Sequence, residues 1–202
     1  LSYHIISQIG YMVMGLGIFT PLGIAAAIYF MIHNMLAKTS AFLVSGVINR
    51  LRGSFDLLKV GGLYRDYPLL AVLFMIPAFA LAGLPPLSGF FGKLGLVKAG
   101  IDSAYFGITA VALYTALLTL YSMVKIWAEA FLTKDPNRGE SSEPEQPVRL
   151  DFQDVLPPLL LGVVIILMGL FANTVLSYTL EAAETLIDPA PYIDAVLKGG
   201  AP

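Results

Sequence analysis

The chain carries the segment Gly-Leu-Pro-Pro-Leu-Ser-Gly-Phe-Phe-Gly-Lys at residues 83–93, inside an apolar block that runs from Pro68 to about Ile101. A regular helix cannot continue through this segment, because the prolines lack amide donors and the glycines loosen the backbone. We therefore expect one discontinuous helix, with halves at 68–84 and 89–101. Such breaks are tolerated at membrane depth only where protein or water satisfies the freed backbone groups, and they indicate a translocation site. Two helices joined by a surface loop are the alternative. The residues of the break are Gly83, Pro85, Pro86, Ser88 and Gly89.

Apolar blocks of similar length fill most of the remaining chain. Of its 202 residues, 57% are hydrophobic and 13% are charged, about half the charged fraction of a soluble domain. A run of ~20 apolar residues crosses ~30 Å of hydrocarbon as a helix. The sequence therefore predicts an all-α polytopic membrane protein, with about five transmembrane helices in a bundle at 1–187 and a C-terminal tail at 188–202. The predicted spans lie at about 3–19, 21–49, 68–101 (broken at 84–89), 103–132 and 157–178.

Prolines and loop charges set the predicted boundaries and orientation. Pro21 follows the first span, and Pro157 with Pro158 suits the first turn of the last span. The loop at 50–66 has an excess of lysine and arginine, which predicts a cytoplasmic position. The Pro, Glu and Ser content of 133–154 predicts a mobile linker. Alternation then predicts that this linker is also cytoplasmic and that the C-terminus lies outside. The first span is short and no signal peptide precedes it, so we expect upstream residues to complete it.

Composition and motifs argue against several function classes. The chain has no cysteine, so it has no disulfides, thiolate metal sites or iron–sulfur clusters. No basic patch with interleaved aromatic residues suggests a nucleic-acid partner. No nucleophile–base constellation, phosphate loop or metal-ligand cluster is visible in the sequence. We therefore expect neither an enzyme nor a bound cofactor or metal.

Two lysines inside the apolar blocks are the strongest functional candidates, because a charge at the bilayer centre costs on the order of 2.5–3.5 kcal/mol on insertion scales. Lys93 directly follows the helix break, where a lysine in a wet cavity can load and release a proton as neighbouring charges change. Lys38 lies in the middle of its block and shares one polar helix face with Asn34, Ser45 and Asn49. The structural alternatives are a snorkelling anchor for Lys93 and a hydrogen-bonded packing face for Lys38.

Four further ionisable residues are weaker candidates for the proton path. Histidine titrates near neutral pH, which suits His33 to a proton relay, although a regular helix would place it about 140° from Lys38. His4 has the same chemistry but lies near the start of the chain. Lys125 and Glu129 are one helical turn apart, so they suit either an ion pair that anchors the helix end or a place on the path.

Carboxylates are scarce in the predicted spans, where Glu129 is the single acidic residue. Hard cations prefer oxygen ligands that carry carboxylate charge. We therefore expect this chain to handle protons, and any site for a metal cation to lie elsewhere.

Four segments carry a family resemblance. They are Tyr-His-Ile-Ile-Ser-Gln-Ile-Gly-Tyr-Met at 3–12, His-Asn-Met-Leu-Ala-Lys-Thr at 33–39 with Ala-Phe-Leu at 41–43, the broken segment at 83–93, and the tail at 182–189 and 192–197. The first three resemble the proton-translocating subunits shared by respiratory complex I, membrane-bound hydrogenases and Mrp-type antiporters, and the broken segment is the most specific match. The tail is similar to the end of the D subunits of the Mrp branch. The resemblance covers essentially the whole chain.

The resemblance implies an inverted repeat of two five-helix units, each with one broken helix and a chain of buried lysine and histidine. This chain would hold the second half of that fold, with protons passing among Lys38, His33 and Lys93 through water-filled half channels. It would act in a Na⁺(K⁺)/H⁺ antiporter complex of the bacterial cell membrane, together with other subunits and membrane lipid, and the metal cation would be exchanged in a partner subunit. Many relatives space the histidine and lysine by four residues, whereas this chain spaces His33 and Lys38 by five.

Two alternative functions stay open at this point. The chain could be a proton-pumping subunit of a redox-driven complex related to complex I or to membrane hydrogenases. It could also be a structural scaffold whose lysines only organise helix packing.

Overall fold

The computed structural model describes residues 4–133 and 150–190, together with 193, 196 and 197. Every regular element in this part of the chain is a helix, which confirms the all-α prediction. Tyr3, the linker residues 134–149 and the tail residues 191–192, 194–195 and 198–202 lie outside the described residues.

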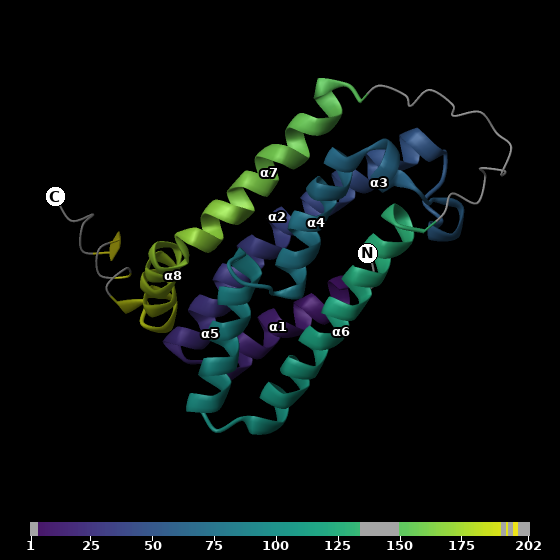
Figure 1. Ribbon diagram of the computed structural model, residues 1–202. Coiled ribbons are helices and arrows are strands. Elements are labelled where there is room, and N and C mark those ends of the chain that lie inside the picture. The colour runs from purple at the N-terminus through teal and green to yellow at the C-terminus, as the bar shows by residue number, and fades with distance from the viewer. Residues whose placement is uncertain (1–3, 134–149, 191–192, 194–195, 198–202) are drawn as a thin grey trace, which may run out of the picture.

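The described residues form a bundle of helices, in which the short elements η1 and α3 lie between α2 and α4 (Figure 1). Helices α2, α6 and α7 are long and apolar enough to cross a membrane, and α1 and α4 are shorter apolar helices. The elements are α1 (His4–Ile18), α2 (Pro21–Arg52), the 3₁₀ turn η1 (Leu57–Lys59), α3 (Leu63–Asp66), α4 (Pro68–Ala82), α5 (Ser88–Asp102), α6 (Phe106–Phe131), α7 (Phe152–Leu170) and α8 (Ala172–Ile187).

Helix α2 lies at the centre of the bundle, where it packs against α1, α4, α5, α7 and α8. Its first turns contain Gly23 and the three buried alanines at 25–27, and small residues let neighbouring helices approach closely. The helix begins at Thr20, whose hydroxyl accepts a hydrogen bond from the Gly23 amide. It ends at Gly53, which adopts a left-handed φ of 69°. Helix α2 therefore presents a side chain to almost every other element of the bundle.

The predicted helix break separates α4 from α5. Helix α4 ends at Ala82 and α5 begins at Ser88, so residues 83–87 form the break where the sequence predicts 84–89. Gly83 adopts a φ of 88°, which favours glycine because side chains are strained in this region. A Cβ atom at Gly89 would overlap the carbonyl oxygen of Ala80. The first turn of α5 therefore lies directly against the last turn of α4.

The last predicted span differs from the structure at both ends. Helix α7 begins at Phe152, because Asp151 and Asp154 form a capping box, and the two prolines expected in its first turn lie inside the helix. It ends at Leu170, whereas the sequence predicts a span to 178. The chain then turns at Phe171 into α8, which runs in a different direction (Figure 1) and packs on Ile24 and Ala25 of α2 through Ala183. The apolar pattern continues through the bend, so periodicity alone could not reveal it.

Described residues of the two predicted cytoplasmic loops contact each other at one end of the bundle. Arg50, near the end of α2, forms an ion pair with Asp154 in the first turn of α7. Arg52 lies 2.9 Å from the carboxylate of Asp66. These contacts place the end of α2, the start of α4 and the start of α7 on the same side, as the predicted alternation of spans requires.

Candidate functional site

Lys93 is buried where the two halves of the broken helix meet. Its side chain is 7% exposed, and its Nζ donates hydrogen bonds to the carbonyl oxygens of Leu81 at 2.8 Å and Ala82 at 3.1 Å. The last carbonyls of a helix have no partner within the helix and form the negative end of its dipole. The end of α4 therefore offers the Lys93 ammonium group two acceptors with favourable electrostatics, inside the bundle.

Gly83 provides the space for this contact. A Cβ atom at position 83 would lie 3.0 Å from Cδ and 3.5 Å from Nζ of Lys93. Any larger residue here would have a strained positive φ and would also crowd the lysine side chain sterically. The glycine of the break therefore shapes the path of the lysine as well as the turn of the chain.

His33 connects the central helix to the same break. The side chain is fully buried, and its Nδ1 lies 2.8 Å from the hydroxyl oxygen of Ser88, the first residue of α5. Its Nε2 has no hydrogen-bond partner within the described residues. This nitrogen lies 2.8 Å from the position of a Cβ atom at Gly89. The imidazole thus faces the start of α5. Its Nδ1 forms a hydrogen bond with Ser88, and its Nε2 is without one in the described structure.

Replacing Ser88 by alanine is expected to weaken this connection. The buried His33 Nδ1 would lose its partner, and an unsatisfied buried polar group costs about 1–3 kcal/mol. We expect a lower thermal stability of the detergent-solubilised complex. Ser177→Ala is a suitable control, because the Ser177 hydroxyl is exposed and bonds only a carbonyl of its own helix. Equal stability of the two variants would contradict a structural role for the His33–Ser88 contact.

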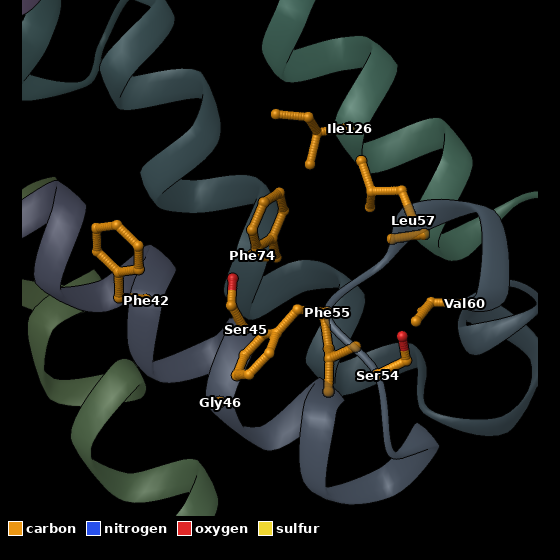
Figure 2. A pocket seen from close by; sticks show the side chains of 11 residues that line it. Phe42, Ser45, Gly46, Ser54, Phe55, Leu57, Val60, Phe74 and Ile126 are labelled. Carbon is orange, nitrogen blue, oxygen red and sulfur yellow. The ribbon is translucent and has the colours of Figure 1, made fainter. Parts of the chain in front are cut away.

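The predicted polar face of α2 is divided between two cavities. Asn34 and Lys38 line a groove of about 750 Å³ between α1 and α2, where the Lys38 Nζ is buried without a hydrogen-bond partner in the described structure. Ser45 lines a separate cavity of about 560 Å³ (Figure 2), enclosed by α2, α4, α6 and the segment at 54–60. Phe42 and Gly46 line both cavities. Asn49 lines neither cavity and is half-buried near the end of α2.

The remaining ionisable candidates make other contacts. His4 Nε2 lies 2.9 Å from the hydroxyl of Ser122 and so links α1 to α6. Lys125 is exposed, and no ion pair joins it to Glu129 in the described structure. Glu129 instead accepts a hydrogen bond from Thr133 at 3.4 Å. Within α2, His33 contacts the start of α5 and Lys38 lines the α1–α2 groove, so the two side chains point to different faces of one unbroken helix.

Two buried residues of α1, Gln8 and Tyr11, also belong to this polar region, although neither was predicted as a site residue. Gln8 is 1% exposed and accepts a hydrogen bond from Asn34 at 3.4 Å. Tyr11 places its ring under Lys93, with 5.3 Å between the ring centroid and Nζ. A polar amide inside an apolar block is a signal that could have indicated Gln8. Tyr11 lies in the segment at 3–12 that carries the family resemblance, but its residue type alone does not distinguish it from an ordinary packing aromatic.

The described residues hold no group of three or more histidine, aspartate or glutamate side chains that could bind a metal ion. The site offers instead a buried lysine with backbone acceptors, a buried histidine and hydroxyl groups. This chemistry suits the holding and transfer of protons.

A multi-pass helical membrane protein with a buried lysine beside a broken helix has the features expected of an ion transporter. Residues 1–119 match the family model described as NADH:quinone oxidoreductase/Mrp antiporter, transmembrane region. The chain belongs to this family, which confirms the resemblance seen in its sequence and its place in the cell membrane as a multi-pass protein.

Curated relatives refine this assignment. The chain is 45% identical to the D subunit of the Na(+)/H(+) antiporter of Alkalihalophilus pseudofirmus, across 98% of this chain and 39% of the relative. It is 39% identical to the protein of the same name from Bacillus subtilis, across 97% of this chain and 39% of the relative. It is 30% identical to the second N subunit of the NADH-quinone oxidoreductase of Syntrophobacter fumaroxidans, with 93% and 38% covered. The chain thus spans about two fifths of the length of these relatives.

Solved structures agree with this fold. A chain in the structure of the Mrp complex from Dietzia sp. superposes with a TM-score of 0.86 at 34% identity, covering 96% of this chain and 43% of that one. A chain of an archaeal membrane-bound sulfane sulfur reductase superposes with a TM-score of 0.72 at 19% identity, covering 87% and 34%, which supports the fold alone. The antiporter-like fold predicted from the sequence is confirmed by these likenesses.

Proposed function

We propose that this chain forms the proton-conducting part of a subunit of a Na⁺(K⁺)/H⁺ antiporter complex, with Lys93 as its central proton carrier. The observation that carries this proposal is the burial of the Lys93 ammonium group on the last carbonyls of α4. Burying a charge is costly, so ionisable residues are rare inside membrane proteins, and those that occur mark ion and proton pathways. The identity of 45% to the D subunit of a Na(+)/H(+) antiporter supports the antiporter class.

The contacts of Lys93 suggest how it carries a proton. The charged ammonium group makes strong hydrogen bonds to the carbonyls of Leu81 and Ala82, whereas a neutral amine would make weaker ones. Loss of the proton therefore loosens the side chain from the end of α4, and a new proton restores the contact. This difference couples the charge of Lys93 to its position.

The other polar groups of α2 extend the proposed path. His33 contacts the start of α5 through Ser88, and Lys38 lies in the α1–α2 groove on another face of the same helix. Water in the groove and around the break would connect these groups, since no direct hydrogen bond joins them in the described structure. His4, Lys125 and Glu129 stay candidates for the path, at the α1–α6 contact and at the end of α6.

The exchanged metal cation is assigned to another part of the complex. Glu129 is the only carboxylate within the described helices α1, α2, α4, α5 and α6 apart from Asp102 at the end of α5. Hard cations prefer oxygen ligands that carry carboxylate charge, and these helices offer few of them. We therefore propose that the chain acts as a transporter subunit, not as an enzyme, and that other subunits of the complex supply the cation site.

A sodium pulse tests the proposed class. Inverted membrane vesicles that contain the assembled complex are given a pH gradient, respiratory donors are then removed, and sodium or potassium is added. We expect the added cation to collapse the gradient, because an antiporter needs no redox reaction. Vesicles without the complex are the control.

The redox-driven alternative is supported by the 30% identity to a subunit of an NADH-quinone oxidoreductase and by the family description, which names that class of complex as well. It predicts that neither cation collapses the gradient in the absence of an electron donor. Proton movement that appears only when a donor is supplied would contradict the antiporter proposal and favour this alternative.

A further inference from the structure

The ring of Tyr11 is a further neighbour of the Lys93 ammonium group. An ammonium group has three N–H donors, and the carbonyls of Leu81 and Ala82 accept two hydrogen bonds from it. The centroid of the Tyr11 ring lies 5.3 Å from Nζ, within the ~6 Å range of cation–π interactions. The lysine head group therefore lies between the carbonyl end of α4 and an aromatic ring on α1.

Tyr11 is held firmly in this position by contacts that do not involve the lysine. The side chain is 3% exposed, and its hydroxyl donates a hydrogen bond to the carbonyl of Ala112 on α6. Its ring packs on Phe30 of α2, with 5.3 Å between the centroids. The hydroxyl group of Tyr11 is thus bound to α6, and its ring lies within cation–π range of the Lys93 ammonium group.

We propose that Tyr11 is a positioning residue that holds Lys93 on the helix break in its protonated form. The negative face of an aromatic ring attracts a cation but has little attraction for a neutral amine. The ring therefore favours the loaded state of the carrier and raises the pH up to which Lys93 keeps its proton. This inference rests on the proposed role of Lys93 as a proton carrier.

Few other ionisable groups compete with Tyr11 at this position. His33 on α2 and His4 on α1 are the histidines of the neighbouring helices. Helix α4 contains no titratable side chain. The acidic and basic groups near the ends of the neighbouring helices are Arg50 and Arg52 in α2, Asp102 in α5, Lys125 and Glu129 in α6, and Asp154 in α7. Lys98 in α5 is exposed, and Lys38 in α2 lines the α1–α2 groove.

Fluorinated phenylalanines at position 11 test this proposal with little change in shape. Each added fluorine withdraws electron density from the ring and weakens cation–π attraction, while the side chain keeps its size and apolar character. Tyr11→Phe is the reference, since it keeps the ring and removes only the hydroxyl. The measurement is the pH dependence of sodium-driven exchange in vesicles that contain the assembled complex.

We expect the alkaline limit of exchange to move toward lower pH with each fluorine, by about one pH unit for the trifluorinated ring. The same series at Phe30 is the matched control, because that ring packs on Tyr11 and His33 instead. An unchanged profile at position 11, or an equal shift at position 30, would overturn the proposal. The proposed function is tested by a different variant: it fails if Lys93→Ala leaves exchange intact.

Discussion

Replacing Lys93 by alanine is expected to abolish sodium-driven proton exchange while the complex still assembles. The substitution removes the ammonium group that binds the carbonyls of Leu81 and Ala82, and with it the proposed proton carrier. Loss of a group that transfers protons typically costs roughly 10²-fold or more in rate. The measurement is the sodium-induced collapse of a pH gradient in inverted vesicles, at equal amounts of assembled complex.

Two further variants test whether Lys93 carries a proton or only supplies a fixed positive charge. Lys93→Arg keeps a positive charge and hydrogen-bond donors, but arginine does not release its proton in proteins, so we expect this variant to be inactive as well. Lys98→Ala removes an exposed lysine from the same helix and should exchange normally. An active Lys93→Arg variant would show that only the charge is needed. Normal exchange by Lys93→Ala would favour the scaffold alternative.

The sequence predicts the broken helix well, because its cause is local. Proline removes an amide donor and glycine permits a positive φ wherever they occur, and residues 83–89 combine both residue types, so this segment favours a break. The membrane location follows from composition in the same direct way. The position of Lys93 beside the break then follows from its place in the chain, four residues after Gly89.

Long-range contacts could not be predicted in this way. The ring of Tyr11 meets Lys93 because α1 and α5 pack together, and a single aromatic residue in an apolar block gives no hint of that contact. Lys38 and Ser45 share a helix face, yet the neighbouring helices place them in different cavities. The bend at Phe171 depends on how α8 packs on α2, which periodicity within one segment does not encode.

Gly89→Ala is expected to destabilise the bundle and to reduce exchange at the same time. The added methyl group would overlap the carbonyl oxygen of Ala80 and would lie 2.8 Å from His33 Nε2. A backbone oxygen cannot move aside as a flexible side chain can, so α5 must shift away from α4. Overpacking of this kind costs about 1–3 kcal/mol, and the helix propensity of alanine offsets only part of it. The shift also separates Lys93 from its carbonyl acceptors, so exchange should fall.

Gly107→Ala is the matched control for this prediction. Gly107 and Gly89 are each the second residue of a helix, but a Cβ atom at Gly107 would meet nothing within 4 Å. The control should therefore be neutral or slightly stabilising, by up to about 1 kcal/mol, because alanine favours the helix over glycine. The measurement is the thermal stability of the detergent-solubilised complex, followed by exchange in vesicles. Equal behaviour of the two variants would contradict the direct contact between α4 and α5 at the break. The description of the Lys93 site depends on this contact.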